Sequence, residues 1–171
     1  MKHTFSLLVE NTFGAFDRVA TLFSAKGFNL HSISIGETEL RDISRMTIVI
    51  SGEDKVVQQA EKQLNRLVDT VKVVNLTKSQ RVERELALIT VNYKKQSLEA
   101  IKNIGDVFRG KVVDINNRTI MLEVTGPPDK INAIVNVLSP FGIIEMARSG
   151  TVALMRGEQQ EAPKKEYLHT N

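Results

Sequence analysis

The sequence predicts an α+β fold built from two tandem βαββαβ modules. Two patterns support this prediction: apolar residues alternate with polar ones over short segments, and they recur at helical spacing over others. A third observation is that the resulting order of strands and helices occurs twice along the 171 residues. The order strand, helix, strand, strand, helix, strand is that of a ferredoxin-like unit.

The first module occupies the N-terminal half of the chain. In order, the expected elements are a strand at 3–10, a helix at 15–25, strands at 30–35 and 46–50, a helix at 57–67 and a strand at 71–76. Gly27 ends the first helix, because glycine is favoured just beyond a helix C-terminus. The polar residues 36–42 connect the second strand to the third.

After a polar stretch at 77–81, which we interpret as a linker, the order repeats. The expected elements are a strand at 86–91, a helix at 98–108, strands at 111–115 and 120–124, a helix at 127–138, a strand at 143–147 and an edge strand at 152–154. We therefore predict a first domain at 1–77, a second ferredoxin-like domain at 78–157 and a disordered tail at 158–171.

Each module has only about 75 residues, close to the size at which a single hydrophobic core is marginal. A four-stranded sheet with both helices on one face leaves its other face open. In the first module that face carries Leu8, which alternates with Leu7 and Val9. We therefore expect a homodimer or larger assembly, in which a second copy covers this face.

Composition argues against several classes of protein. The net charge of +3 is dispersed among nearly equal numbers of both signs, whereas a nucleic-acid binder concentrates basic residues. The strands at 45–50 and 119–124 contain no aromatic residue, which argues against base stacking by RNA. The chain has no Cys, and we find no signal peptide or transmembrane segment, so we expect a cytoplasmic protein.

We predict no catalytic residue and no metal ligand. The three histidines, His3, His31 and His169, have no partner at the short spacings of local metal motifs. Neither a nucleophile elbow nor a phosphate loop occurs. We interpret Glu83 and Glu85 as solvent-facing charges rather than an acid/base pair. An enzymatic site assembled from residues distant in the sequence stays open.

The loop at 10–15, between the first strand and the first helix, has the properties of a ligand site. A helix N-terminus offers unpaired N–H groups that can hold a carboxylate. Gly14 lets a ligand approach the backbone, and Asn11 offers both a donor and an acceptor, as does Asn29. Taken alone, these residues are more simply explained as a helix cap by Asn11 or Thr12 and as turns.

At this loop the sequence resembles the start of an ACT domain. The segments that carry the resemblance are Glu10-Asn11, Gly14-Ala15, Arg18-Val19, Leu22-Phe23 and Gly27-Phe28-Asn29. Further segments resemble the small regulatory subunits of acetolactate synthase (acetohydroxyacid synthase): Ser44-Arg45-Met46-Thr47, Glu61-Lys62-Gln63-Leu64, Leu67-Val68, Val82-Glu83-Arg84-Glu85, Phe108-Arg109-Gly110 and Ala147-Arg148-Ser149-Gly150. The resemblance covers roughly residues 2–157.

The resemblance implies a regulatory role without catalysis. Such subunits dimerise through their ACT domains and bind valine at that interface. The effector loop of the family maps onto Asn11, Gly14 and Ala15, and Asn29 and Leu30 of the partner chain would complete the pocket.

The implied partner is a separate catalytic subunit that carries thiamine diphosphate, a divalent metal and a flavin. It joins two pyruvates, or pyruvate and 2-oxobutyrate, in the synthesis of branched-chain amino acids. The resemblance implies that this chain raises the activity of the catalytic subunit and makes it sensitive to feedback inhibition by valine.

The alternative is a free-standing amino-acid-binding ACT protein that regulates another enzyme. The segments Glu83-Arg84-Glu85 and Ala147-Arg148-Ser149-Gly150 speak against it, because they lie in the second module. The sequence leaves open whether leucine or isoleucine competes with valine, and which surface contacts the catalytic subunit.

Overall fold

The computed structural model describes residues 1–157, so the tail predicted at 158–171 lies outside the described residues. The described chain forms two compact units. One contains Met1–Val82 together with residues 152–157, and the other contains Glu83–Thr151. The structural boundary thus lies five residues after the one predicted from sequence at 77, and residues 152–157 group with the first unit.

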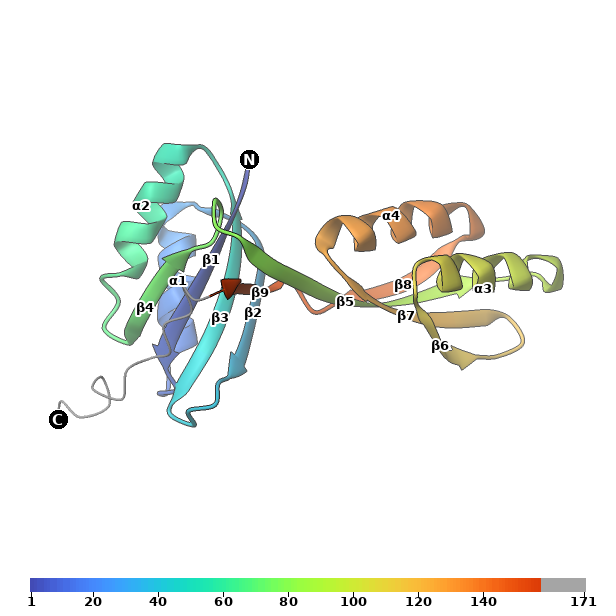
Figure 1. Ribbon diagram of the computed structural model, residues 1–171, viewed down its shortest axis with the longest axis horizontal. Helices are drawn as coiled ribbons and strands as arrows, with labels where there is room; N and C mark the ends of the chain where they lie inside the picture. Colours follow the sequence, from blue (N-terminus) through green and yellow to red (C-terminus); the bar gives the residue numbers. More distant parts are fainter. Residues whose placement is uncertain (158–171) are drawn as a thin grey trace. The chain divides into compact units, whose positions relative to one another are not determined.

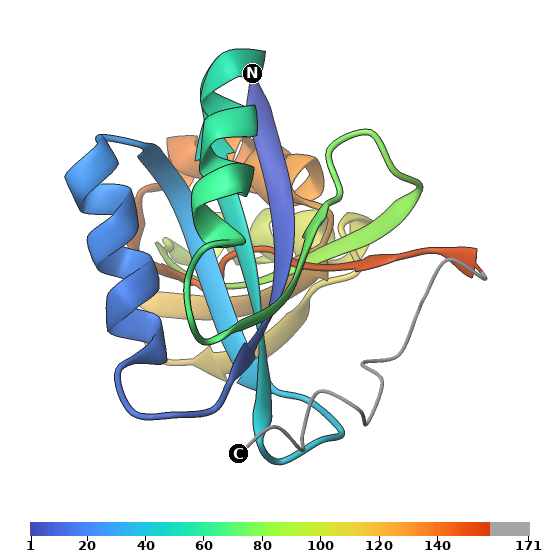
Figure 2. The same ribbon diagram turned by 90° about the vertical axis from the view of Figure 1, so that its left-hand side faces the viewer.

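The first unit has the predicted βαββαβ order. Its elements are β1 (Lys2–Glu10), α1 (Ala15–Lys26), β2 (Asn29–Glu37), β3 (Ile43–Ser51), α2 (Asp54–Leu64) and β4 (Thr70–Asn75). The strands form an antiparallel sheet in the order β2-β3-β1-β4, which leaves β2 and β4 at the edges. Both helices cover the same face of this sheet (Figures 1 and 2).

The core of the first unit lies between the sheet and its helices. Alternate residues of the two central strands face the helices, and the helices contribute residues at spacings of three and four. The buried members are Phe5, Leu7, Val9, Met46, Ile48 and Ile50 from the strands, and Val19, Phe23, Val57, Ala60 and Leu64 from the helices. The α+β class predicted from these periodicities is confirmed.

We had expected the opposite face of this sheet to be open. Instead, the chain covers part of it with its own residues. Thr47 lies on that face, since it alternates with the core residues on β3. Its Oγ1 accepts the N–H of Ala153 at 3.3 Å, and Ala153, in β9 (Val152–Met155), is 1% exposed. As expected for an edge strand of the second module, β9 pairs with β5 (Arg81–Asn92), but its residues group with the first unit. Because β9 covers part of this face, an open face no longer argues for a second copy.

The second unit repeats the fold. It contains β5 (Arg81–Asn92), a short 3-10 turn (Lys95–Ser97), α3 (Leu98–Val107), β6 (Lys111–Ile115), β7 (Thr119–Gly126), α4 (Pro128–Leu138), a second 3-10 turn (Ser139–Phe141) and β8 (Ile143–Arg148). The strand order is β6-β7-β5-β8, and α3 and α4 lie on one face (Figure 1). None of the helices in the described residues is both long and apolar enough to cross a membrane.

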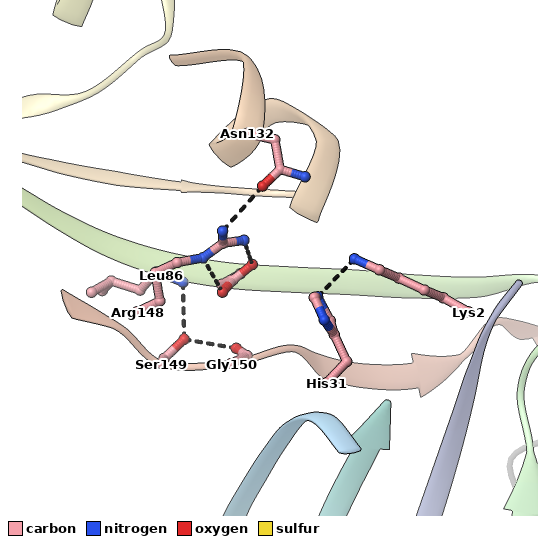
Figure 3. Close-up of polar contacts among 8 residues, drawn as sticks. Lys2, His31, Leu86, Asn132, Arg148, Ser149 and Gly150 are labelled. Atoms are coloured by element: carbon pink, nitrogen blue, oxygen red, sulfur yellow. Dashed lines mark hydrogen bonds and ion pairs between the residues drawn. The ribbon is translucent and has the colours of Figure 1, made fainter. Parts of the chain in front are cut away.

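Glu85 is buried, which corrects the interpretation that it faces solvent. It is 5% exposed and forms a bidentate ion pair with Arg148, with N–O distances of 2.7 and 2.6 Å (Figure 3). Arg148 also donates to Oδ1 of Asn132 on α4 at 3.0 Å. The hydrogen bond between Arg148 and the carboxylate of Glu85 raises the pKa of Arg148. The pair therefore fastens β5 and β8 to the helix layer of the second unit.

The packing of β9 onto the first unit gives a testable prediction. Ala153→Glu would place a carboxylate in a nearly inaccessible position, and we expect the free energy of unfolding to fall by about 3 kcal/mol or more. Val152→Glu is the matched control, because Val152 is 51% exposed. Urea denaturation measures both variants, and equal effects would contradict the assignment of β9 to this face.

Candidate functional site

The β1–α1 loop (residues 11–14) forms one wall of a small pocket in the first unit. Gly14 closes this loop in the left-handed conformation, with φ of 84°, immediately before α1 begins. The cavity has a volume of about 140 Å³. Its lining residues come from the end of β1, the loop, the first turn of α1, and β2 and β3: Val9, Glu10, Asn11, Thr12, Gly14, Ala15, Phe16, Asp17, Ile35, Ser44 and Met46.

The structure brings three of the five predicted site residues together. Asn11, Gly14 and Ala15 line the pocket. Asn29 and Leu30 lie at the beginning of β2, where they pair with the end of β3, whereas the pocket touches β2 at Ile35. Six residues of extended strand separate Asn29 from Ile35, which is about 20 Å. A single chain therefore does not assemble all five residues at one site.

The backbone amides available to a ligand lie in the first turn of α1. The N–H of Ala15 donates to the carbonyl of Thr12 at 3.2 Å, and the N–H of Arg18 donates to the carbonyl of Gly14 at 3.0 Å. The amides of Phe16 and Asp17 come between them in the first helical turn, where N–H groups have no intrahelical acceptor. These two residues line the pocket, so their amides and the helix dipole suit a carboxylate.

The pocket also offers acceptors for a cation. The Asn11 Nδ2 donates to the carbonyl of Arg41 at 3.3 Å, which leaves its Oδ1 as an acceptor. Glu10 and Asp17 add two carboxylates to the lining. A ligand with a carboxylate and an ammonium group would find complementary partners for both.

The remaining wall of the pocket is apolar and ends at a sheet edge. Val9 and Met46 are buried beneath it, and Ile35 on the edge strand β2 is 52% exposed. A volume of about 140 Å³ is well below the roughly 300 Å³ at which pockets for drug-sized ligands begin. The site therefore suits a ligand of a few heavy atoms and lies beside the edge strand of the sheet.

Sequence reasoning missed the residues that hold this loop. Asp69 accepts two hydrogen bonds from the guanidinium of Arg18, one of them at 2.8 Å from Nη2, and a third from Oγ1 of Thr12 at 3.2 Å. The hydrogen bond from Arg18 holds the pKa of Asp69 below its usual range, and burial acts in the opposite direction. Asp69 also raises the pKa of Arg18. Arg18 and Asp69 are separated by 51 residues, so no local pattern could have joined them.

Within residues 1–157, the acidic and histidine side chains form no group of three that could hold a metal ion. Residues 5–72 match a family model described as an acetohydroxyacid synthase small subunit-like ACT domain. Residues 84–157 match the model of the small subunit of acetolactate synthase.

Individual relatives agree with these two matches. The chain is 46% identical over 160 residues to a probable acetolactate synthase small subunit of Archaeoglobus fulgidus, covering 94% of this chain and all of the relative. It is 49% identical over 156 residues to the acetolactate synthase small subunit of Aquifex aeolicus, covering 91% and 81%. The crystal structure of the small subunit from Thermotoga maritima aligns with a TM-score of 0.83 at 39% identity, covering 92% and 99%.

The lowered pKa of Asp69 predicts a dependence of stability on pH. A carboxylate whose pKa is lower in the folded chain stabilises it above the unfolded pKa, about 3.9, and this stabilisation is lost as the pH falls through the folded pKa. Asp69→Asn should therefore lower the melting temperature at neutral pH, and the difference from wild type should shrink below about pH 4. Melting curves across this range test it, and a difference independent of pH would contradict it.

Proposed function

Since the chain belongs to the family of acetolactate synthase small subunits, we propose that it acts as the non-catalytic regulatory subunit of that enzyme. In this role it raises the activity of the catalytic subunit and makes it sensitive to feedback inhibition by valine. The observation that carries the proposal is the pocket beside the β1–α1 loop, which combines donors, acceptors and an apolar wall. Thiamine diphosphate, a divalent metal and a flavin belong to the catalytic subunit in this proposal.

Valine matches the three kinds of group in the pocket. Its carboxylate would accept from the amides of Phe16 and Asp17, and its ammonium would donate to Oδ1 of Asn11. Its isopropyl group would pack against Ile35 and Met46. The pocket thus combines donors, an acceptor and an apolar wall, which favours a zwitterion with a short apolar side chain.

A second copy of the chain would complete the site through the β2 edge. Suppose that two β2 strands pair in antiparallel fashion about a two-fold axis at their midpoint, Ile33. Asn29 of the partner would then lie opposite Glu37, and Leu30 of the partner opposite Gly36. Both would come to the end of β2 that borders the pocket. The two predicted residues that lie about 20 Å away in one chain would thus join the other three.

Binding between two copies gives the effector a way to act. A ligand shifts an equilibrium only as far as it binds one arrangement better than the other. Valine held by the loop of one chain and by β2 of the next would favour a particular pairing of the two. We propose that this pairing deactivates the bound catalytic subunit. Valine binding would then be coupled by linkage to the activity of the catalytic subunit.

The first prediction concerns the assigned acceptor. Asn11→Ala removes the Oδ1 that meets the ammonium, and a hydrogen bond to a charged group contributes about 1.5–3 kcal/mol. We expect valine affinity to fall about ten- to hundredfold in isothermal titration, with a parallel loss of inhibition of the reconstituted enzyme. Asn65→Ala is the control, because Asn65 is an exposed residue at the end of α2. Unchanged affinity in Asn11→Ala would refute the site assignment.

The second prediction concerns the β2 edge. Ile35→Lys should favour the monomer, because it places a charge in the proposed interface at a position that is half-exposed in one chain. Light scattering should give a mass near 19.1 kDa for the variant and twice that for wild type. Phe13→Lys adds the same charge to a fully exposed residue on the β1–α1 loop and should remain dimeric. A dimeric Ile35→Lys, or a monomeric wild type, would contradict this interface.

A further inference from the structure

We propose that Arg18 and Asp69 are positioning residues that hold the β1–α1 loop in its ligand-binding shape without touching the ligand. The inference rests on the proposed effector function of the same pocket and identifies what sets the affinity of that pocket. Neither residue belongs to the pocket lining, which consists of loop, helix and strand residues around them.

Asp69 bonds the chain at three points around the loop. Its backbone carbonyl accepts the N–H of Glu10, the last residue of β1, at 2.9 Å. Its carboxylate accepts from Oγ1 of Thr12 at 3.2 Å and from the guanidinium of Arg18 in the first turn of α1. One residue thus fixes the end of the strand, the middle of the loop and the start of the helix.

Arg18 extends this network to the rest of the loop. Its Nη2 donates to the carbonyl of Phe13 at 3.3 Å as well as to Asp69. Its Nη1 lies 3.1 Å from the position that a Cβ on Gly14 would occupy. The guanidinium therefore packs directly against the two residues that precede the helix and shapes the backbone that borders the pocket.

Besides the backbone bonds of its own turn, from the N–H of Ala15 to Thr12 and from the N–H of Arg18 to Gly14, the loop is held at Asn11. The N–H of Asn11 donates to the carbonyl of Asp42 at 2.7 Å, and its Nδ2 donates to the carbonyl of Arg41. The side chains of Asp69 and Arg18 add contacts to Thr12, Phe13 and Gly14. A bidentate pair between an arginine and a carboxylate fixes orientation as well as distance, so it suits this task.

Asparagine at position 69 cannot reproduce the pair. The guanidinium only donates, and an asparagine side chain has one oxygen and one NH₂ group, so one of the two bonds is replaced by two donors facing each other. Lysine at position 18 keeps the charge but has no planar fork to bind the carboxylate and the carbonyl of Phe13 together.

A matched pair in the second unit separates positioning from general stability. Glu85 and Arg148 also form a bidentate ion pair, and Glu85 is buried, but the pair belongs to the other unit. Glu85→Gln therefore removes a comparable interaction without changing the β1–α1 loop. If Asp69 acts only on stability, both substitutions should affect ligand binding equally.

The experiment is isothermal titration of the full chain with valine for wild type, Asp69→Asn, Arg18→Lys and Glu85→Gln, with amide hydrogen exchange at residues 12–17. We expect Asp69→Asn and Arg18→Lys to weaken binding about tenfold or more and to speed exchange in the loop, because charge-assisted bonds are lost. Glu85→Gln should keep the affinity within about twofold. Arg18→Lys retains the charge, so it remains informative if Asp69→Asn folds poorly.

The outcomes separate this inference from the proposed function. If wild type binds valine and both loop variants bind it equally well, the positioning role is overturned and the effector site stands. An equal loss of affinity in Glu85→Gln also overturns it, since general destabilisation would then explain the data. If wild type binds no valine in the isolated chain or in the reconstituted enzyme, the proposed function and this inference both fall.

Discussion

The arrangement of the first unit depends on a sheet whose two helices cover only one face. β1 and β3 lie in the centre of this sheet and β2 lies at its edge. Seven consecutive residues of β1 are buried, because other residues of the chain cover part of the opposite face as well. The β1–α1 connection must then cross from the central strand to the helix layer. It does so beside the edge strand β2, so the pocket forms where a helix N-terminus, a central strand and an edge strand meet.

Periodicity predicted most of this fold because each helix and strand buries one face. The misses have separate physical causes. Glu85 lies two residues before the core residue Ala87 and so shares its face of β5. Its charge suggested solvent exposure, and its burial is explained by the ion pair with Arg148 on β8. The four residues of β9 could be recognised as a strand, yet a strand this short does not encode which sheet it will cover.

Some residues of the candidate site could likewise be predicted from the sequence, and others could not. Asn11, Gly14 and Ala15 could be predicted because a helix N-terminus and a left-handed glycine are properties of a short segment. Asp69 could not, because its role arises from the α2–β4 connection meeting the loop in three dimensions. Asn29 and Leu30 are a third case, because they lie far from the pocket of their own chain. In the proposed dimer they would reach the pocket of the partner chain instead.

The small volume of the pocket limits how a ligand could control a large enzyme. Moving an equilibrium from 1:99 to 99:1 requires about 5.5 kcal/mol of differential binding, and the best small ligands gain at most about 1.5 kcal/mol per heavy atom. A ligand that fills about 140 Å³ must therefore bind almost entirely to one arrangement. That requires donors that are already oriented before the ligand arrives. A loop held by Asp69 on one side and by the carbonyls of Arg41 and Asp42 on the other meets this requirement, since these contacts come from the chain itself.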